Sequence, residues 1–102
     1  MLNRFFERFE NKDKLTISRL VSEIQDSIDD LYLKEPNNPT FEQEGFINGS
    51  NIVKEYIDQG EYGVAIEHLI YMVYESDISY PTEILEKLQS LTSKYNIKNL
   101  YL

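Results

Sequence analysis

The chain has 102 residues, a hydrophobic fraction of 41%, no cysteine and a formal net charge of -8 at pH 7. This length predicts a single folded domain over residues 1–102, and the lack of cysteine excludes disulfides and cysteine-based metal sites. Between Leu20 and Glu86 the only cations are Lys34 and Lys54, so nucleic acid, whose phosphates need lysine and arginine, is not expected as a partner.

The N-terminal segment combines an apolar stripe with a polar stretch. Four apolar side chains recur at helical spacing, namely Leu2, Phe5, Phe6 and Phe9. This spacing predicts one or two amphipathic turns, whereas the polar residues 10–14 fit either a loop or a continuation of the helix. The segment lacks the apolar run and cleavage site of a signal peptide, and no stretch is apolar enough for a membrane span, so we expect a cytoplasmic protein.

The next segment carries the clearest helical pattern. Apolar residues from Leu15 to Leu31 are mostly three or four positions apart, which predicts a helix over residues 14–33. Asp13 or Thr16 is the expected N-cap of this helix.

Residues 34–50 are expected to form one long loop. They include two of the three prolines and two of the four glycines, which favour turns and interrupt any core period. We expect Phe41, Phe46 and Ile47 to pin this loop to the body of the protein, and loops of this length often carry function.

Three further helices are expected in the second half. The first is capped by Ser50 or Asn51 and ends at Gly60, which adopts the left-handed C′ conformation without strain. The second opens at Glu61 or Tyr62 and is apolar around more than half its circumference, which is typical of a central helix. Pro81 suits the first turn of the last helix. No segment alternates strictly between apolar and polar residues, so the predicted fold class is all-α, a compact bundle of about four helices with one long loop.

The sequence contains few residues suited to catalysis. We therefore expect that the protein is not an enzyme and that it binds no cofactor and no metal ion. The single histidine, His68, has no carboxylate or serine at helical spacing, and phosphate-binding loops and nucleophile elbows are absent. Asp26, Asp29 and Asp30 are dense in oxygen ligands but lack the glycine turn and terminal glutamate of a calcium loop. A metal- or carboxylate-dependent hydrolase built on these three aspartates is a further alternative.

An interaction surface is the feature that the composition favours. Tyrosine is common at interfaces, and carboxylates speed the capture of a basic macromolecule. The alternative is that the tyrosines are core residues with their hydroxyls at the rim, and that the acidic surface only aids solubility. The residues expected to contact a partner are Asp26, Asp29, Asp30, Asp58, Glu61, Tyr62, Tyr74, Glu75, Asp77 and Tyr80.

Residues 56–97 carry a recognisable pattern. It consists of the pair Gly60-Glu61 between two helices, then Tyr62, Ala65, Glu67 and Leu69, then the connector Asp77-Ile78-Ser79, and Leu88 in the closing helix. This pattern resembles the Maf-type immunity proteins, small bacterial proteins that neutralise the toxin domains of polymorphic and contact-dependent inhibition systems. The N-terminal segment and residues 35–49 have no counterpart in that pattern.

The resemblance implies an all-helical inhibitor that is encoded with its toxin. Toxins of such systems are often nucleases with basic clefts, so the implied function is an immunity protein that blocks the basic active-site cleft of a cognate toxin domain. The alternative is a non-catalytic adaptor or regulatory subunit that assembles, for example as a homodimer, through the N-terminal stripe of Leu2, Phe5, Phe6 and Phe9.

Overall fold

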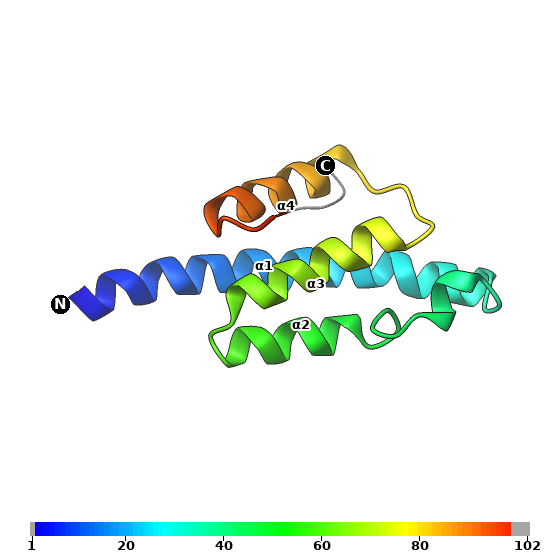
Figure 1. Cartoon of the computed structure of the whole chain (residues 1–102), viewed down its shortest axis with the longest axis horizontal. Coiled ribbons are helices and arrows are strands. Elements are labelled where there is room, and N and C mark those ends of the chain that lie inside the picture. The colour runs from blue at the N-terminus through cyan, green and yellow to red at the C-terminus, as the bar shows by residue number, and fades with distance from the viewer. Residues whose placement is uncertain (1, 99–102) are drawn as a thin grey trace.

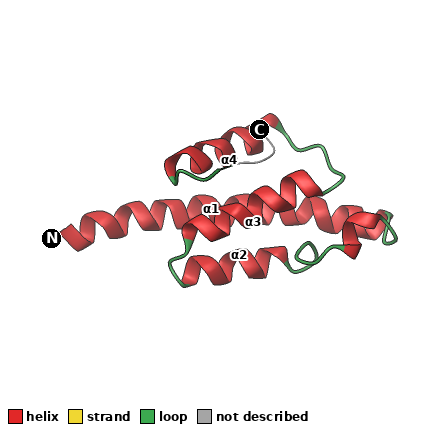
Figure 2. Ribbon diagram, in the orientation of Figure 1, coloured by secondary structure: helices red, strands yellow, loops and turns green. Residues whose placement is uncertain are grey.

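Three shorter helices pack along one long helix (Figure 1). The computed structural model describes the backbone of residues 2–98 and the side chains of residues 12–98. The elements in chain order are α1 (Leu2–Lys34), a 3-10 turn (Pro39–Glu42), α2 (Gly49–Asp58), α3 (Tyr62–Glu75) and α4 (Thr82–Lys94). No strand occurs among residues 2–98 (Figure 2), so the predicted all-α bundle of four helices with one long loop is confirmed.

Helix α1 is longer than the predicted helix over residues 14–33. It begins at Leu2 because residues 10–14, which contain no proline or glycine, continue the helix. The expected N-caps are therefore wrong, since Asp13 and Thr16 both lie inside α1. The apolar side chains of residues 2–9 lie outside the described side chains, so their proposed role in assembly stays a prediction.

The boundaries of the later helices follow their local sequence. Gly60 follows α2 with φ of +75°, in the left-handed conformation that the sequence predicts. Glu61 precedes the first residue of α3, and Pro81 precedes the first residue of α4. The start of α2 differs, because Asn48 rather than Ser50 or Asn51 occupies the N-cap position.

The hydrophobic core surrounds α3, which confirms its predicted central position. Its buried residues are Ala65, Ile66, Leu69, Ile70, Met72 and Val73. They join buried aliphatic side chains of the other three helices, such as Ile24 of α1, Val53 of α2 and Leu88 of α4. Each buried side chain of this size contributes about 1.5–3 kcal/mol through removal of apolar surface from water. No described helix combines the length and the apolar character that crossing a membrane requires.

A buried amide on α1 fixes the long loop and the start of α2. The Gln25 side chain donates from Nε2 to the carbonyl oxygen of Phe46 at 2.9 Å and accepts at Oε1 from the backbone N–H of Ser50 at 2.8 Å. The first N–H groups of a helix have no partner within the helix, and Asn48 makes no side-chain capping bond. Gln25 therefore supplies from another helix the acceptor that a local N-cap residue would provide.

The loop packs through two of its three predicted anchors. Phe46 is fully buried and Phe41 is half-buried against the core. The prediction is wrong for Ile47, which is 57% exposed. Phe46 takes the buried position beside α1 and α3, so the next side chain in the loop points outward.

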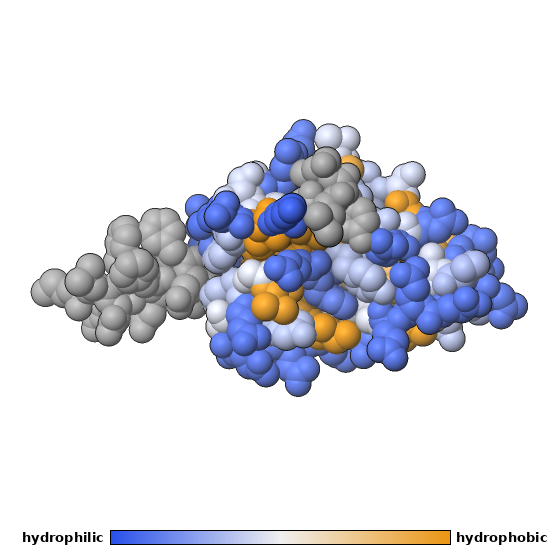
Figure 3. Space-filling view, viewed as in Figure 1, coloured by the Kyte–Doolittle hydropathy of each residue, from blue (hydrophilic) through white to orange (hydrophobic). Residues whose placement is uncertain are grey.

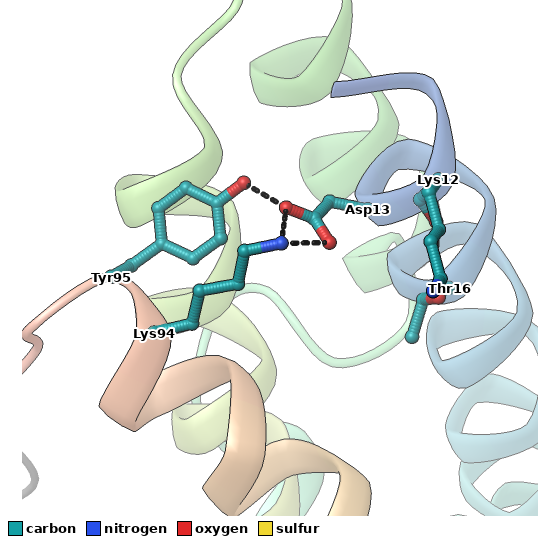
Figure 4. A network of polar contacts seen from close by, with 5 residues as sticks. All are labelled: Lys12, Asp13, Thr16, Lys94 and Tyr95. Atoms are coloured by element: carbon teal, nitrogen blue, oxygen red, sulfur yellow. Dashed lines mark hydrogen bonds and ion pairs between the residues drawn. The ribbon is translucent and has the colours of Figure 1, made fainter. Parts of the chain in front are cut away.

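A carboxylate of α1 holds the end of α4 (Figure 4). The two oxygens of Asp13 lie 2.9 and 2.7 Å from Lys94 Nζ, and the Tyr95 hydroxyl donates to Oδ2 at 2.5 Å. Asp13 is only 6% exposed, so these contacts replace the water that the carboxylate loses on folding. The side chain that the sequence marks as a helix cap instead joins two helices.

We expect Gln25→Ala to lower the free energy of unfolding by about 2 kcal/mol, because the Ser50 N–H loses its acceptor and the Phe46 carbonyl keeps only the Gly49 N–H at 3.2 Å. Urea unfolding followed by circular dichroism measures this change. Gln89→Ala is the control, since Gln89 is exposed on α4, and it should change stability by less than about 0.5 kcal/mol. Equal effects of the two substitutions would contradict the assigned role of Gln25.

The two ion pairs that the described side chains of α1 form with other helices should differ in strength. Asp13→Asn should cost about 2 kcal/mol, because Asp13 is nearly buried and has two partners. Asp58→Asn removes the ion pair with Lys14, in which Nζ lies 3.4 Å from Oδ1 and the Asp58 side chain is 70% exposed. This substitution should lower the free energy of unfolding by less than about 0.5 kcal/mol. Chemical denaturation of the two variants in parallel measures both values, and a larger effect at Asp58 would refute this ranking.

Candidate interaction surface

The charges of the protein are unevenly distributed along the bundle. We call residues 26–48, the last turns of α1 and the loop that follows, the loop end. It contains one cation, Lys34, and six exposed acids, which are Asp26, Asp29, Asp30, Glu35, Glu42 and Glu44. In the view of Figure 1 the loop end lies on the right, and the same region in Figure 3 is mostly hydrophilic with small apolar areas.

The opposite end of the bundle is neutralised by lysines. We call this region, where Asp13 meets Lys94 and Lys14 meets Asp58, the lysine end. The ion pairs among the described side chains lie there or within α4, and none involves the loop end. The loop end therefore carries negative charge that nearby cations of the described chain do not offset, and such a surface attracts cationic partners.

Apolar side chains are exposed at the same end. Five large hydrophobic residues are exposed among the described side chains, and Tyr32, Leu33 and Ile47 of the loop end are three of them. Leu33 is 80% exposed. Aromatic and aliphatic side chains surrounded by charge are the usual anchors of protein interfaces.

Helix α3 holds the loop from a second side. His68 Nε2 lies 3.0 Å from the carbonyl oxygen of Gly45, and the Tyr71 hydroxyl donates to the carbonyl oxygen of Glu44 at 2.9 Å. Gly45 has φ of +89°, and a Cβ there would lie 2.8 Å from His68 Cε1, so both the backbone and the contact require glycine. His68 thus has a structural contact with the loop and is half-buried on α3.

A hollow opens between the end of α1 and the loop. Tyr32 and Phe41 pack edge to face, with ring centroids 5.0 Å apart. The hollow has a volume of about 320 Å³ and is lined by Tyr32, Pro36, Asn37, Asn38, Phe41, Glu42 and Ile47. It combines aromatic walls with amide and carboxylate groups, and it opens on the acidic loop end.

The ten residues predicted to contact a partner do not form one patch. Asp26, Asp29 and Asp30 are exposed at the loop end, where Gln25 Nε2 donates to Asp29 Oδ1 at 3.0 Å. Asp58 lies beside Lys14, which precedes Asp26 by 12 residues on α1, or about 18 Å along the helix. The loop end and the lysine end are therefore separate surfaces.

The remaining predicted residues divide between the two ends of α3. Glu61 is exposed at its start, and Tyr62 is half-buried against Tyr95 with ring centroids 6.1 Å apart. Beyond its other end, Asp77 is exposed. The rest are half-buried, which are Tyr74, Glu75 and Tyr80.

The tyrosines between positions 56 and 80 share one placement. All five are half-buried and pack against the core, which is the position that the alternative of core tyrosines expects for their rings. The Tyr80 hydroxyl lies 3.0 Å from Ser76 Oγ. Burial raises the pKa of Tyr80, and the Ser76 hydrogen bond lowers it in part.

The residues of this surface that the sequence did not predict as partner contacts are Tyr32, Leu33, Glu42, Glu44 and Ile47. The available signal was the pair Tyr32-Leu33 at the end of the apolar stripe, directly before a loop rich in acids. What places these residues together is the packing of Phe41 on Tyr32, a contact between helix and loop that no local pattern encodes.

The described side chains offer no metal site, because no three histidine, aspartate or glutamate residues among them lie close enough to share an ion. Asp26, Asp29 and Asp30 therefore do not form the ligand cluster that a metal-dependent hydrolase would need from this part of the chain.

The titration of Tyr71 should report the charge around the loop. Its pKa is raised above the usual 10.0 by burial first, and then by the carboxylates Glu75 and Glu44. Glu44→Gln should lower the pKa of Tyr71, whereas the pKa of Tyr80, which is raised by burial, should not move. NMR titration of the tyrosine ring signals measures both values in one experiment.

The raised pKa of Tyr71 also fixes the sign of a stability effect. The folded state holds the phenol proton more tightly than the unfolded chain does, so this contribution is complete below about pH 10 and is lost as the pH rises through the folded pKa. Tyr71→Phe should make the stability curve flatter in this alkaline range. A steeper decline in the variant would contradict the assigned shift.

Comparison with known proteins does not add a relative. No protein-family model matches the chain, no curated protein matches it, and no solved structure matches it.

Proposed function

We propose that the protein binds a basic protein domain through its loop end, as an immunity protein that neutralises a cognate bacterial toxin. The observation that carries the proposal is the coincidence of exposed acids and exposed apolar side chains on residues 26–48. A nuclease is the favoured toxin class, because its cleft must be basic to bind phosphates.

Each kind of side chain has a separate part in this binding. The acids of the loop end steer a basic surface toward it and raise the association rate. Leu33 and Ile47 then bury apolar surface against the partner, which slows dissociation. Carboxylates such as Asp30 and Glu42 could occupy positions that nucleic acid phosphates take in the toxin.

The resemblance of residues 56–97 to Maf-type immunity proteins supports the toxin as the partner. These residues include α3 and α4, and the resemblance implies an all-helical inhibitor. The loop end lies outside this segment, so its charge is an independent argument for a basic partner.

Capture from the native host identifies the partner. We expect the tagged protein to retain a basic toxin fragment encoded beside it, and addition of the protein should abolish the activity of that fragment. Retention of a second copy alone would favour the adaptor alternative, and a bound toxin that keeps its full activity would exclude neutralisation.

Charge reversal then locates the binding surface. The triple variant Asp26→Lys, Asp30→Lys and Glu42→Lys should slow association with the captured toxin at least about tenfold and weaken its dependence on salt. The control reverses the same number of exposed acids elsewhere, at Glu55, Glu67 and Glu86. Stopped-flow measurements compare the two variants, and equal slowing would show that net charge, rather than the loop end, governs binding.

A further inference from the structure

The hollow beside Tyr32 has the chemistry of a seat for one cationic side chain. We propose that it binds an arginine side chain of the basic partner. The identity of the partner rests on the proposed function, but the seat itself belongs to this chain and is testable without the partner.

The walls of the hollow suit a guanidinium group. Tyr32 is 41% exposed and packs edge to face on Phe41, at an angle of 75° between the ring planes. Aromatic rings attract a cation placed over their faces, and arginine stacks on them readily because its planar group is weakly hydrated. Ile47 and Pro36 offer apolar surface to the methylene groups of the same side chain.

The polar lining supplies acceptors, which a guanidinium needs because it only donates hydrogen bonds. Glu42 is exposed and forms no ion pair with the described side chains, so its carboxylate is available for a two-point contact. Asn37 adds an amide oxygen at the same hollow. Asn38 Oδ1 already accepts from the N–H of Thr40 at 2.9 Å, so its main role is to hold the turn in shape.

The surrounding charge selects a cation over other occupants. Asp29, Asp30, Glu35 and Glu44 belong to the same end of the molecule, where Lys34 is the only base. An anionic or purely apolar side chain would leave the negative charge of these acids unneutralised, whereas arginine neutralises part of it. The volume of about 320 Å³ also leaves room for backbone next to the arginine.

The seat is formed before binding. Gln25 holds the carbonyl of Phe46, and His68 and Tyr71 hold Gly45 and Glu44, so residues 44–46, which lie between two lining residues of the hollow, are fixed to two helices. A site that is already ordered loses less conformational entropy on binding. A small arginine compound should therefore occupy the hollow without the rest of a partner.

The test is an NMR titration of the full chain with N-acetyl-arginine amide. We expect saturable shifts centred on the backbone signals of residues 32, 36–42 and 47, with a dissociation constant on the order of millimolar. N-acetyl-citrulline amide has nearly the same shape but no charge, and it should cause no saturable shift at these positions. N-acetyl-lysine amide should bind at least about threefold more weakly, because it lacks the planar group.

Two variants locate the interaction. Tyr32→Leu and Glu42→Gln should each weaken arginine binding at least about threefold. Glu67→Gln is the matched control for charge, since Glu67 is an exposed acid on α3 and does not line the hollow, and it should leave binding unchanged. The NMR spectra of the variants also show whether the fold is retained.

Three results would overturn the seat: equal shifts with the citrulline compound, shifts spread over acids of the whole surface, or full binding by Glu42→Gln. These outcomes differ from a failure of the proposed function. If charge reversal at the loop end left toxin binding unchanged, the proposed function would be refuted. The titration with the free arginine compound would still test whether the hollow binds arginine.

Discussion

The buried side-chain amide of Gln25 is the contact on which the half of the molecule that carries the candidate surface depends. It joins α1 to the carbonyl of Phe46 and to the first turn of α2, where the N–H of Ser50 would otherwise lack an acceptor. Gly49 lies directly beside this amide, and a Cβ there would come within 2.5 Å of Met72 Cε. The amide thus lies where the loop and α2 meet α1, close to Met72 of α3, and it fixes the loop and the start of α2 relative to α1.

The fixed loop has a consequence for recognition. Its acids and rings extend from a segment that is hydrogen-bonded to α1 and α3 and anchored by the fully buried Phe46. A partner that binds here would meet an ordered surface, and little of the interaction energy would be lost in ordering it. At the lysine end, by contrast, Asp13 and Asp58 already have intramolecular cations, so these acids are less available to a partner.

Local sequence patterns predicted the later helices well because the signals were local. The left-handed Gly60, the proline before α4 and the apolar circumference of α3 each act within a few residues. The failures involve contacts between distant positions. Gln25 meets partners 21 and 25 residues away, and Asp13 meets Lys94 from 81 residues away. An aspartate that caps a helix and one that forms a tertiary ion pair look alike in sequence. The sequence therefore predicts the local role, a helix N-cap, for Asp13. The hollow depends in the same way on the meeting of Tyr32 with Phe41.

The arrangement of charge argues against a surface that serves solubility alone. Solubility is served when charges are spread and apolar side chains are covered. Here six acids share the loop end with one lysine, although their mutual repulsion opposes folding, and Leu33 is left 80% exposed among them. Lysines placed at this end would have relieved the repulsion, as Lys14 and Lys94 do at the other end. A basic partner with apolar anchors, as proposed above, would remove both costs at once, since it would neutralise the acids and cover the exposed side chains.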